Sequence, residues 1–324
     1  MIRLKLVPEN TTINFMGPAR YTFGLSLVLM VLSLVAFFSV GLNFGIDFRG
    51  GTSIRTESTQ AVNVGAYRAA IAPLNVGDVA ISEVFDPSFG PERNVAMVRI
   101  QAQANAEAVT PETLTRIEAA LRAMDPELRF TSVESVGPKV SGELVQQAML
   151  AVGAALLGIL FYIWLRFEWQ FAVGAVAALV HDVVLTIGIF TVLQLRFDLA
   201  IIAALLTIVG YSINDTVIVF DRMRENLIKY KQRDVTDVMN LSLNETLART
   251  LMTSFTTLLA LFALITLGGD VIRGFVFAMI WGIFVGTWSS VYVAAVIVRW
   301  LGVKRDPGKG KTESKGGTQF TPSA

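Results

Sequence analysis

The sequence predicts an α-helical, multi-pass membrane protein with six spanning helices and one α+β domain inserted between the first two helices. Hydrophobic residues make up 53% of the 324 residues, only 16% are charged, and the mean hydropathy is +0.57. Soluble domains are about 45–50% apolar and about 25% charged. Six apolar runs can cross a bilayer, which takes about 20 helical residues. A long polar stretch separates the first run from the second.

The six runs follow one another with short connections, apart from the inserted stretch. They are Tyr21–Leu42, Ala148–Leu165, Phe171–Leu195, Leu199–Phe220, Thr250–Leu267 and Gly274–Val298. The first is longer than the apolar region of a signal peptide, about 7–15 residues, so we predict an uncleaved anchor, with a signal peptide as the alternative. Helices 2–6 occupy 148–303, and 304–324 is predicted to be a disordered tail.

Lys and Arg gather in three places: before the first run, after the fourth and after the sixth. Positive charge is retained on the cytoplasmic side of a membrane. Residues 1–20, the loop 221–248 and the tail are therefore predicted to be cytoplasmic. The stretch 43–147 is predicted to lie outside.

This outer stretch predicts a ferredoxin-like α+β domain. Its order β-α-β-β-α-β is that of a split βαβ unit. The domain shows no nucleophile–base pair and no cluster of ligands, so a binding or mechanical module is expected rather than an enzyme. The predicted strands are Thr52–Glu57, Val79–Phe85, Asn94–Gln101 and Arg129–Val136; one helix carries Tyr67, Ala70, Ile71 and Leu74 on one face, and the second begins after Thr110 with Leu114, Ile117, Leu121 and Met124.

An acidic residue interrupts the fourth apolar run. Asp215 follows Asn214 near the end of that run and shares one helix face with Thr207 and Tyr211. An ionised side chain at the bilayer centre costs about 2.5–3.5 kcal/mol even on the lenient insertion scale, so it usually faces a protein interior or water and marks ion or proton transport. We therefore predict that Asp215 is the main proton-binding residue.

Two other runs carry polar faces. The fifth shows Arg249, Thr253, Thr256, Thr257 and Ala260, and the third aligns Ala175, Ala178, Asp182 and Thr186 with His181 beside them. Such faces are satisfied when the helices pack together around a hydrated interior. The predicted relay is Asp215 and Arg249, with Asp182, His181, Asn214 and Thr253 as further candidates. A purely structural role for Asp182 and His181 is an equal alternative.

Arg249 stands at the cytoplasmic edge of the fifth run, from which its side chain could reach Asp215. Arginine keeps its proton at any relevant pH, so the carboxylate is the partner that titrates. Protonation would remove the countercharge of Arg249 and change the preferred helix arrangement. One proton crossing about 100 mV yields roughly 2.3 kcal/mol, enough to bias a two-state change. The alternative is a static ion pair that fixes helix register.

The sixth run has a small residue at every fourth position, which allows another helix to approach closely. The small residues are Gly274, Ala278, Gly282, Gly286, Ser290 and Ala294. We expect this face to pack on a helix of this chain or of a second one.

Other kinds of site are disfavoured. His181 is the only histidine and cysteine is absent, which excludes a zinc or haem site with several histidine ligands. A net charge of +1 predicts no nucleic-acid partner. Gly310-Lys311-Thr312 imitates the end of a phosphate-binding loop, but Arg305 occupies the place of the required first glycine. No cofactor and no metal are expected, and protons are the predicted coupling ion.

Several motifs together resemble the SecF branch of the SecD/SecF family, membrane subunits of the bacterial Sec protein-export machinery. The resemblance covers about residues 15 to 303. The motifs are Gly45-Ile46-Asp47-Phe48-Arg49-Gly50-Gly51-Thr52, Val136-Gly137-Pro138 with Gly142-Glu143-Leu144, His181-Asp182-Val183, Gly210-Tyr211-Ser212-Ile213-Asn214-Asp215-Thr216 running into Phe220-Asp221-Arg222, and Arg249-Thr250 with Thr253-Ser254.

The resemblance implies a fold of the RND transporter superfamily in the bacterial inner membrane. It implies work with a SecD partner beside the SecYEG channel, using the proton-motive force to help unfolded preproteins leave the channel on the periplasmic side after the SecA step; YajC is a further implied partner. The family's transmembrane Asp and Arg correspond to Asp215 and Arg249. The segment with Gly45, Asp47, Phe48, Gly50 and Gly51 would act as a hinge for the outer domain, with a plain turn as the alternative.

Two other functions compete with this one. A stand-alone proton-coupled exporter of small molecules fits an RND-like layout, but six spans are half of a usual RND chain. An intramembrane aspartyl protease would use Asp182 and Asp215, yet paired acids must lie close enough to share a proton, and these two differ in expected depth.

Overall fold

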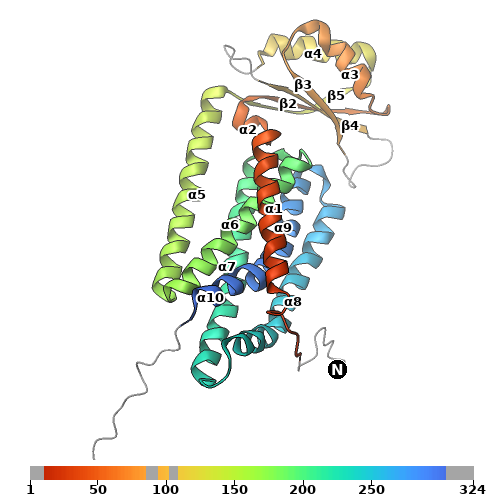
Figure 1. Cartoon of the computed structure of the whole chain (residues 1–324). Coiled ribbons are helices and arrows are strands. Elements are labelled where there is room, and N and C mark those ends of the chain that lie inside the picture. The colour runs from red at the N-terminus through yellow and green to blue at the C-terminus, as the bar shows by residue number, and fades with distance from the viewer. Residues whose placement is uncertain (1–10, 85–93, 102–108, 304–324) are drawn as a thin grey trace, which may run out of the picture.

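We describe a computed structural model that covers residues 11–84, 94–101 and 109–303. Within these residues six helices are long and apolar enough to cross a membrane, which confirms the predicted fold class (Figure 1). They are α1 (Ala19–Ser39), α5 (Pro138–Arg166), α6 (Trp169–Val192), α7 (Leu199–Lys229), α8 (Val235–Leu267) and a sixth made of α9 (Gly269–Ser289), the π-helical turn η2 (Ser290–Ala294) and α10 (Ala295–Leu301). The phosphate-loop imitation, the predicted tail and the last residue of the predicted strand Val79–Phe85 lie outside the described residues.

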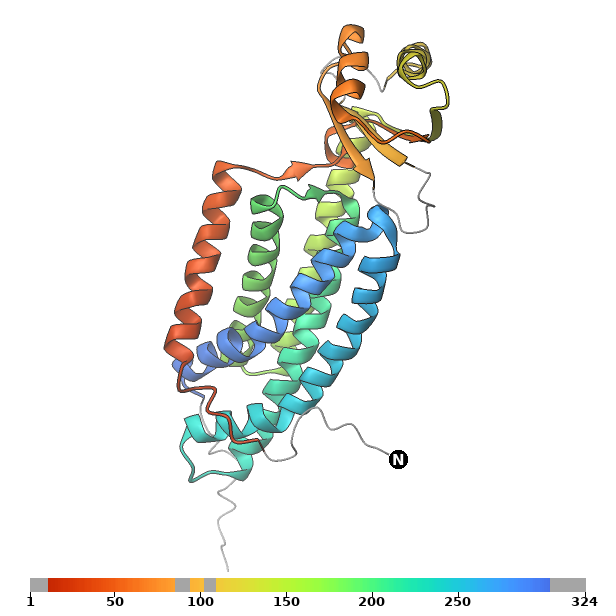
Figure 2. The ribbon, with the colours of Figure 1, turned by 90° about the vertical axis from the view of Figure 1, so that its right-hand side faces the viewer.

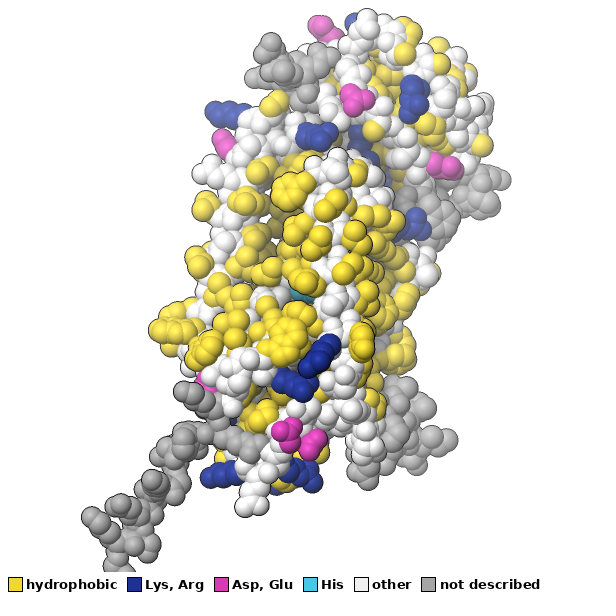
Figure 3. All heavy atoms as spheres, viewed as in Figure 1, with side chains coloured by type: hydrophobic (Ala, Val, Ile, Leu, Met, Phe, Trp, Pro, Cys, Tyr) yellow, Lys and Arg dark blue, Asp and Glu magenta, His cyan; other side chains and the backbone are white. Residues whose placement is uncertain are grey.

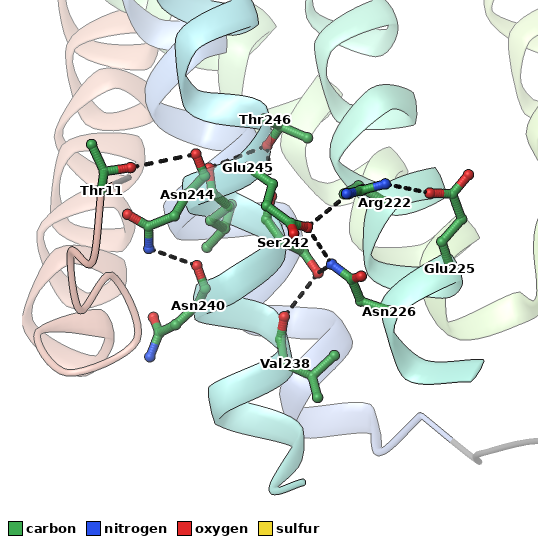
Figure 4. Close-up of polar contacts among 11 residues, drawn as sticks. Thr11, Arg222, Glu225, Asn226, Val238, Asn240, Ser242, Asn244, Glu245 and Thr246 are labelled. Carbon is green, nitrogen blue, oxygen red and sulfur yellow. Dashed lines mark hydrogen bonds and ion pairs between the residues drawn. The ribbon is translucent and has the colours of Figure 1, made fainter. Parts of the chain in front are cut away.

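Residues 221–248, which were predicted to be a loop, are mostly helical. Helix α7 continues to Lys229 and α8 already begins at Val235, so only residues 230–234 connect them. The two extensions form a helical hairpin whose apolar side chains join the bundle core; these are Met223, Leu227, Val238, Met239 and Leu243. On the polar side, the Asn226 amide donates to Ser242 at 3.0 Å and to Glu245 at 2.6 Å (Figure 4). A hydropathy window stops where helices leave the membrane, so it missed both extensions.

The segment before α1 lies across this hairpin. The Ile13 amide donates to the Asn244 side chain at 2.9 Å, and Asn244 donates back to the Ile13 carbonyl at 2.8 Å. Asn240 accepts from the Met16 amide at 2.9 Å. Thr11 reaches the Asn244 carbonyl from the same side (Figure 4). We call residues 11–16 the N-terminal strap.

Helices α6, α7 and α9 form the centre of the bundle, and α1, α5 and α8 lie around them (Figures 1 and 2). The exposed faces of the outer helices carry large apolar side chains, such as Leu32, Phe161 and Phe262. Figure 3 shows these side chains as a yellow band between two charged ends. This surface suits a lipid bilayer, where apolar side chains outside need no cover.

The α+β domain lies beyond one end of the bundle. Its four-stranded antiparallel sheet has the order β3-β4-β2-β5, with α3 (Val64–Ile71) and α4 (Pro111–Met124) packed on the face away from the membrane helices (Figures 1 and 2). This is the topology of a ferredoxin-like split βαβ unit. The strands are β2 (Gly51–Ser58), β3 (Val79–Val84), β4 (Asn94–Gln101) and β5 (Arg129–Val136). Alternate strand residues fill the core with Ile54, Val98 and Ile100, against Tyr67 and Ile117 from the helices.

A compact junction joins this domain to the bundle. Strand β1 (Asn43–Phe44) pairs in parallel with β6 (Arg196–Phe197), just before α7, and the short helix α2 (Ile46–Arg49) follows. The Asp47 carboxylate accepts a hydrogen bond from the Leu199 amide at 3.2 Å, at the first turn of α7. Its carbonyl accepts from Ser141, near the start of α5, at 2.7 Å. The first turns of α5 and α7 are therefore bonded to the segment that leads into β2.

Candidate functional site

The centre of the bundle holds a buried carboxylate. Asp215 on α7 is 7% exposed and accepts hydrogen bonds from Thr250 on α8 at 2.5 Å and from Ser290 at the start of η2 at 2.9 Å. Three separate helical segments thus meet at one side chain. Both donors are neutral hydroxyls, which lower the cost of burial without fixing the charge of the acid.

A second buried carboxylate lies on α6. Asp182 is fully buried and accepts from Ser212 of α7 at 2.5 Å and from Ser289 of α9 at 2.9 Å. Its other oxygen lies 3.0 Å from Nδ1 of His181, which is also buried. A carboxylate at this position favours the tautomer with the hydrogen on Nδ1. The structure therefore places Asp182 and His181 together in the interior.

Arg249 does not pair with Asp215 among the residues that the structure describes. Its side chain is exposed, as is that of Thr253, whereas the buried face of α8 carries Thr250 and Ser254. The stripe predicted to face inward is thus displaced by one residue, about 100° of helix rotation. The adjacent Thr250 occupies the position facing the acid and donates to it.

The displaced stripe forms an unusual membrane surface. Arg249, Thr253 and Thr256 are exposed on α8, and Asn214 is exposed on the neighbouring α7. Thr207, Gly210 and Ala203 continue the same small or polar exposed line on α7. The Thr207, Thr253 and Thr256 hydroxyls donate to carbonyls of their own helices, so Arg249 and Asn214 are the polar side chains that would be costly against lipid.

The three glycines among the small residues of the sixth run lie where α9 contacts α7. A side-chain carbon added at Gly282 would sit 2.3 Å from Ile208, and one at Gly286 would sit 3.2 Å from Ser212. Gly274 faces Ile201. Ala278 and Ala294 are fully buried. Close approach at these positions brings Ser289 and Ser290 within reach of the two carboxylates.

The glycine-rich segment lies in the junction between bundle and domain. Gly50 has φ 71° and Gly51 has φ 137°, backbone conformations that favour glycine. Phe48 packs against Phe44 and Phe197, and the Gly45 amide donates to the Phe197 carbonyl at 2.8 Å. The segment is bonded to the bundle before Gly50 and continues into the sheet after Gly51.

A charged pair caps α7 beside this junction. Asp198 is the N-cap residue and accepts from the Ile201 amide at 3.3 Å, while Arg196 lies 3.5 Å away. Burial raises the pKa of Asp198, although Arg196 and the capping amides act against this rise. Burial, helped by the nearby Arg196, lowers the pKa of Arg99 to about 10 on the facing strand β4.

The sequence did not identify the four hydroxyl groups that hold the acids. Thr250, Ser212, Ser289 and Ser290 donate to Asp215 or Asp182, yet Ser290 was predicted only as a packing residue, and Thr250 and Ser212 entered only as parts of the family motifs. Two adjacent serines within an apolar run were the available signal. Among the described residues, no group of three or more His, Asp or Glu side chains could hold a metal ion.

Two family models match this chain. The model described as protein export membrane protein SecD/SecF, C-terminal, matches residues 116–304, and the SecD/SecF GG motif matches residues 35–62. The second match contains the glycine-rich junction, and the first contains both buried acids.

Relatives and solved structures agree with these matches. The chain is 62% identical to the protein translocase subunit SecF of Cereibacter sphaeroides over 98% of both chains, and 61% identical to that of Rhodobacter capsulatus over 95% of this chain and 94% of the relative. It is also similar to the crystal structure of SecDF, a translocon-associated membrane protein from Thermus thermophilus, with 37% identity and a TM-score of 0.81. That match covers 91% of this chain but only 39% of the longer SecDF chain. The chain therefore belongs to the SecD/SecF family of protein export membrane proteins, as a multi-pass translocase subunit of the SecF type.

Proposed function

We propose that this chain, paired with a SecD partner in the bacterial inner membrane, couples proton movement to the release of preproteins on the outer side. The single observation that carries the proposal is Asp215, a carboxylate buried between three helical segments and held by the neutral donors Thr250 and Ser290. Such a site accommodates the acid both with and without its proton. Intramembrane acids of this kind mark proton pathways.

A bonded path connects Asp215 to the outer domain. Asp215 and the Leu199 amide belong to the same helix, α7, and Leu199 is bonded to Asp47. Asp47 lies only a few residues before the glycines that lead into the sheet. A tilt or shift of α7 on protonation would thus reach the α+β domain directly. A proton falling through about 100 mV supplies roughly 2.3 kcal/mol to bias such a shift.

The polar face of α7 and α8 supports a SecD partner. Arg249, Thr253 and Asn214 are exposed at membrane depth in the isolated chain. A second bundle on this face would cover them and place Arg249 at an interface beside the helix that carries Asp215. The similar SecDF chain is long enough to hold a second bundle. The Lys and Arg residues before the first apolar run, after the fourth and after the sixth support the orientation in which both ends of the chain are cytoplasmic.

The test is preprotein release from vesicles that contain the complete Sec complex under an imposed proton gradient. Asp215→Asn keeps the size and polarity of the side chain and one of its two acceptor oxygens, but removes its ability to exchange a proton. We expect the gradient-dependent part of release to be lost. Asp221→Asn is the matched control, because Asp221 lies on the same helix, pairs with Arg166 at 2.7 Å and is partly exposed. Undiminished gradient-dependent release with Asp215→Asn would refute the proposed coupling.

The partner face can be mapped by cross-linking, because the chain contains no cysteine. A single cysteine introduced at Thr253 should form a disulfide with suitably placed cysteines in SecD. A cysteine at Phe161 on α5, exposed among apolar side chains, is the control. Equal cross-linking at both positions would argue against a specific interface on α7 and α8.

A further inference from the structure

Two adjacent serines connect the buried acids. Ser289, the last residue of α9, donates to Oδ2 of Asp182 at 2.9 Å. Ser290, the first residue of η2, donates to Oδ2 of Asp215 at 2.9 Å. One short segment of backbone thus carries a hydrogen-bond donor for each carboxylate, although the acids belong to different helices.

Each serine has a second acceptor within its own helix. The Ser289 hydroxyl lies 3.1 Å from the Gly286 carbonyl, and the Ser290 hydroxyl lies 3.0 Å from the Thr287 carbonyl. A hydroxyl has only one hydrogen to donate. Each serine hydroxyl can therefore donate either to a carboxylate or to a backbone carbonyl, but not fully to both. An ionised carboxylate is the stronger acceptor, and a protonated one competes less well.

The backbone at this point has a local irregularity. Residues Ser290–Ala294 form a π-helical turn between α9 and α10. Such turns are rare overall, and many of them lie at functional sites. The extra residue in the turn rotates the side chains that follow it about the helix axis. Here the turn begins at the serine that contacts Asp215. A change in the hydrogen bond of either serine acts on the same turn.

The acids lie at different depths in the bundle. Val192 and Leu199 are close in sequence and mark the same end of α6 and α7. Counted from that end at about 1.5 Å per residue, Asp182 lies about 15 Å deep and Asp215 about 24 Å deep. Ser212, which also donates to Asp182, lies one helical turn before Asp215. The two carboxylates are therefore arranged in series along the membrane normal.

We propose that Ser289 and Ser290 are positioning residues that couple Asp182 to Asp215, so that a proton on one acid changes the affinity of the other for its own proton. This inference rests on the proposed function, in which Asp215 exchanges protons. The hydroxyls keep their hydrogens and change only their acceptors. No proton passes through the serines.

Other titratable side chains surround the pair. On the packed helices near the middle of the bundle these are His181 on α6, Tyr211 on α7, Arg249 on α8 and Tyr292 on η2, and Asp221, Arg222 and Glu245 follow towards the α7–α8 hairpin. Helices α1, α5, α9 and α10 carry theirs near their ends. Of these titratable side chains in the described part of the chain, only His181 is within hydrogen-bond distance of either carboxylate.

Infrared spectroscopy of the full chain, reconstituted in lipid with its partner, tests the coupling. The carbonyl stretch of a protonated carboxyl group reports each acid, and Asp182→Asn and Asp215→Asn assign the bands. We expect Asp215→Asn to shift the titration midpoint of Asp182 by about one pH unit, the size typical of interacting neighbours. In the Ser289→Ala, Ser290→Ala background this shift should disappear. Ser289→Thr with Ser290→Thr keeps both hydroxyls and should restore it.

Thr287→Val is the matched control, since this hydroxyl on the same helix bonds to Ser254 at 3.0 Å and contacts neither acid in the described structure. It should leave the shift intact. An Asp182 midpoint that is independent of Asp215 in the wild-type background, or bands that do not titrate, would overturn the coupling. Loss of gradient-dependent release with Asp215→Asn, together with independent midpoints, would reject only the serine coupling. Coupled midpoints with normal release would reject only the proposed function.

Discussion

The two buried carboxylates have different surroundings, although each accepts from two hydroxyl groups. Asp182 also has an imidazole beside it and is fully buried, whereas Asp215 lies near the exposed face of α7 and α8. Asp215 is thus the acid with closer access to a partner chain or to water. The sequence identified both acids from the cost of charge in an apolar run. It could not identify their donors, because a serine in a membrane helix bonds equally well to its own backbone.

Close packing of α9 on α7 can be tested at one glycine. Gly282→Ala would place a new carbon 2.3 Å from Ile208, within the branched part of a buried side chain. We expect a loss of roughly 1–3 kcal/mol in stability, as for other overpacked sites. Gly158→Ala on α5 is the control, because no atom lies within 4 Å, and a small gain of about 0.5–1 kcal/mol is expected. Thermal unfolding in detergent measures both, and equal melting temperatures would contradict the close contact.

At the scale of elements, the sequence predicted the strands better than the helix ends. Strands Asn94–Gln101 and Arg129–Val136 have the predicted bounds, since turn residues and alternating side chains mark both ends. Helices α5, α7 and α8 extend well beyond their apolar runs. The rotation of α8 about its own axis also differs from the prediction, because Arg249-Thr250 and Thr253-Ser254 offer two adjacent polar faces. Only packing against Asp215 decides which of them is buried.

Two aspartates cap helices with opposite electrostatic consequences. Burial raises the pKa of Asp198 above its ordinary 3.8, so its contribution to stability is present at low pH and is lost as pH rises through the raised pKa. A hydrogen bond from Thr236 lowers the pKa of Asp234, whose contribution is present at neutral pH and is lost as pH falls below 3.8.

Replacing each cap with asparagine keeps the capping oxygen and removes the charge. We expect Asp198→Asn to raise the melting temperature at neutral pH, with a gain that shrinks as pH falls towards 3.8. Asp234→Asn should lower it at neutral pH, with a deficit that stays nearly constant down to pH 4, because it closes only below 3.8. Unfolding followed by tryptophan fluorescence between pH 4 and 8 compares the two variants. The same sign of change for both would show that their environments do not differ as described.

For the whole molecule, the narrow junction is the point through which the bundle can act on the outer domain. The Asp47 side chain bonds to the first turn of α7, and its backbone bonds to the first turn of α5. The glycine-rich motif predicted a hinge. The residues that bond to Asp47, which are Ser141 and Leu199, are distant in sequence and could be identified only from the fold.

Asp47→Ala removes the bond to α7 and leaves both buried acids untouched. We expect gradient-dependent preprotein release to fall about fivefold or more, in the range of typical coupling energies between sites. Infrared titration of Asp215 should be unchanged. Asp47→Asn retains an acceptor oxygen for the Leu199 amide and should keep most of the release activity. A release rate for Asp47→Ala equal to wild type would place the transmission elsewhere.

The N-terminal strap has a consequence for how the protein is assembled during synthesis. Its anchor, Asn244, is separated from Ile13 by 231 residues, so the docking site does not yet exist while the early helices are entering the membrane. The strap must wait, undocked, until the first turns of α8 have left the ribosome. Residues 11–16 therefore reach their final place only after four helices of the bundle have been made.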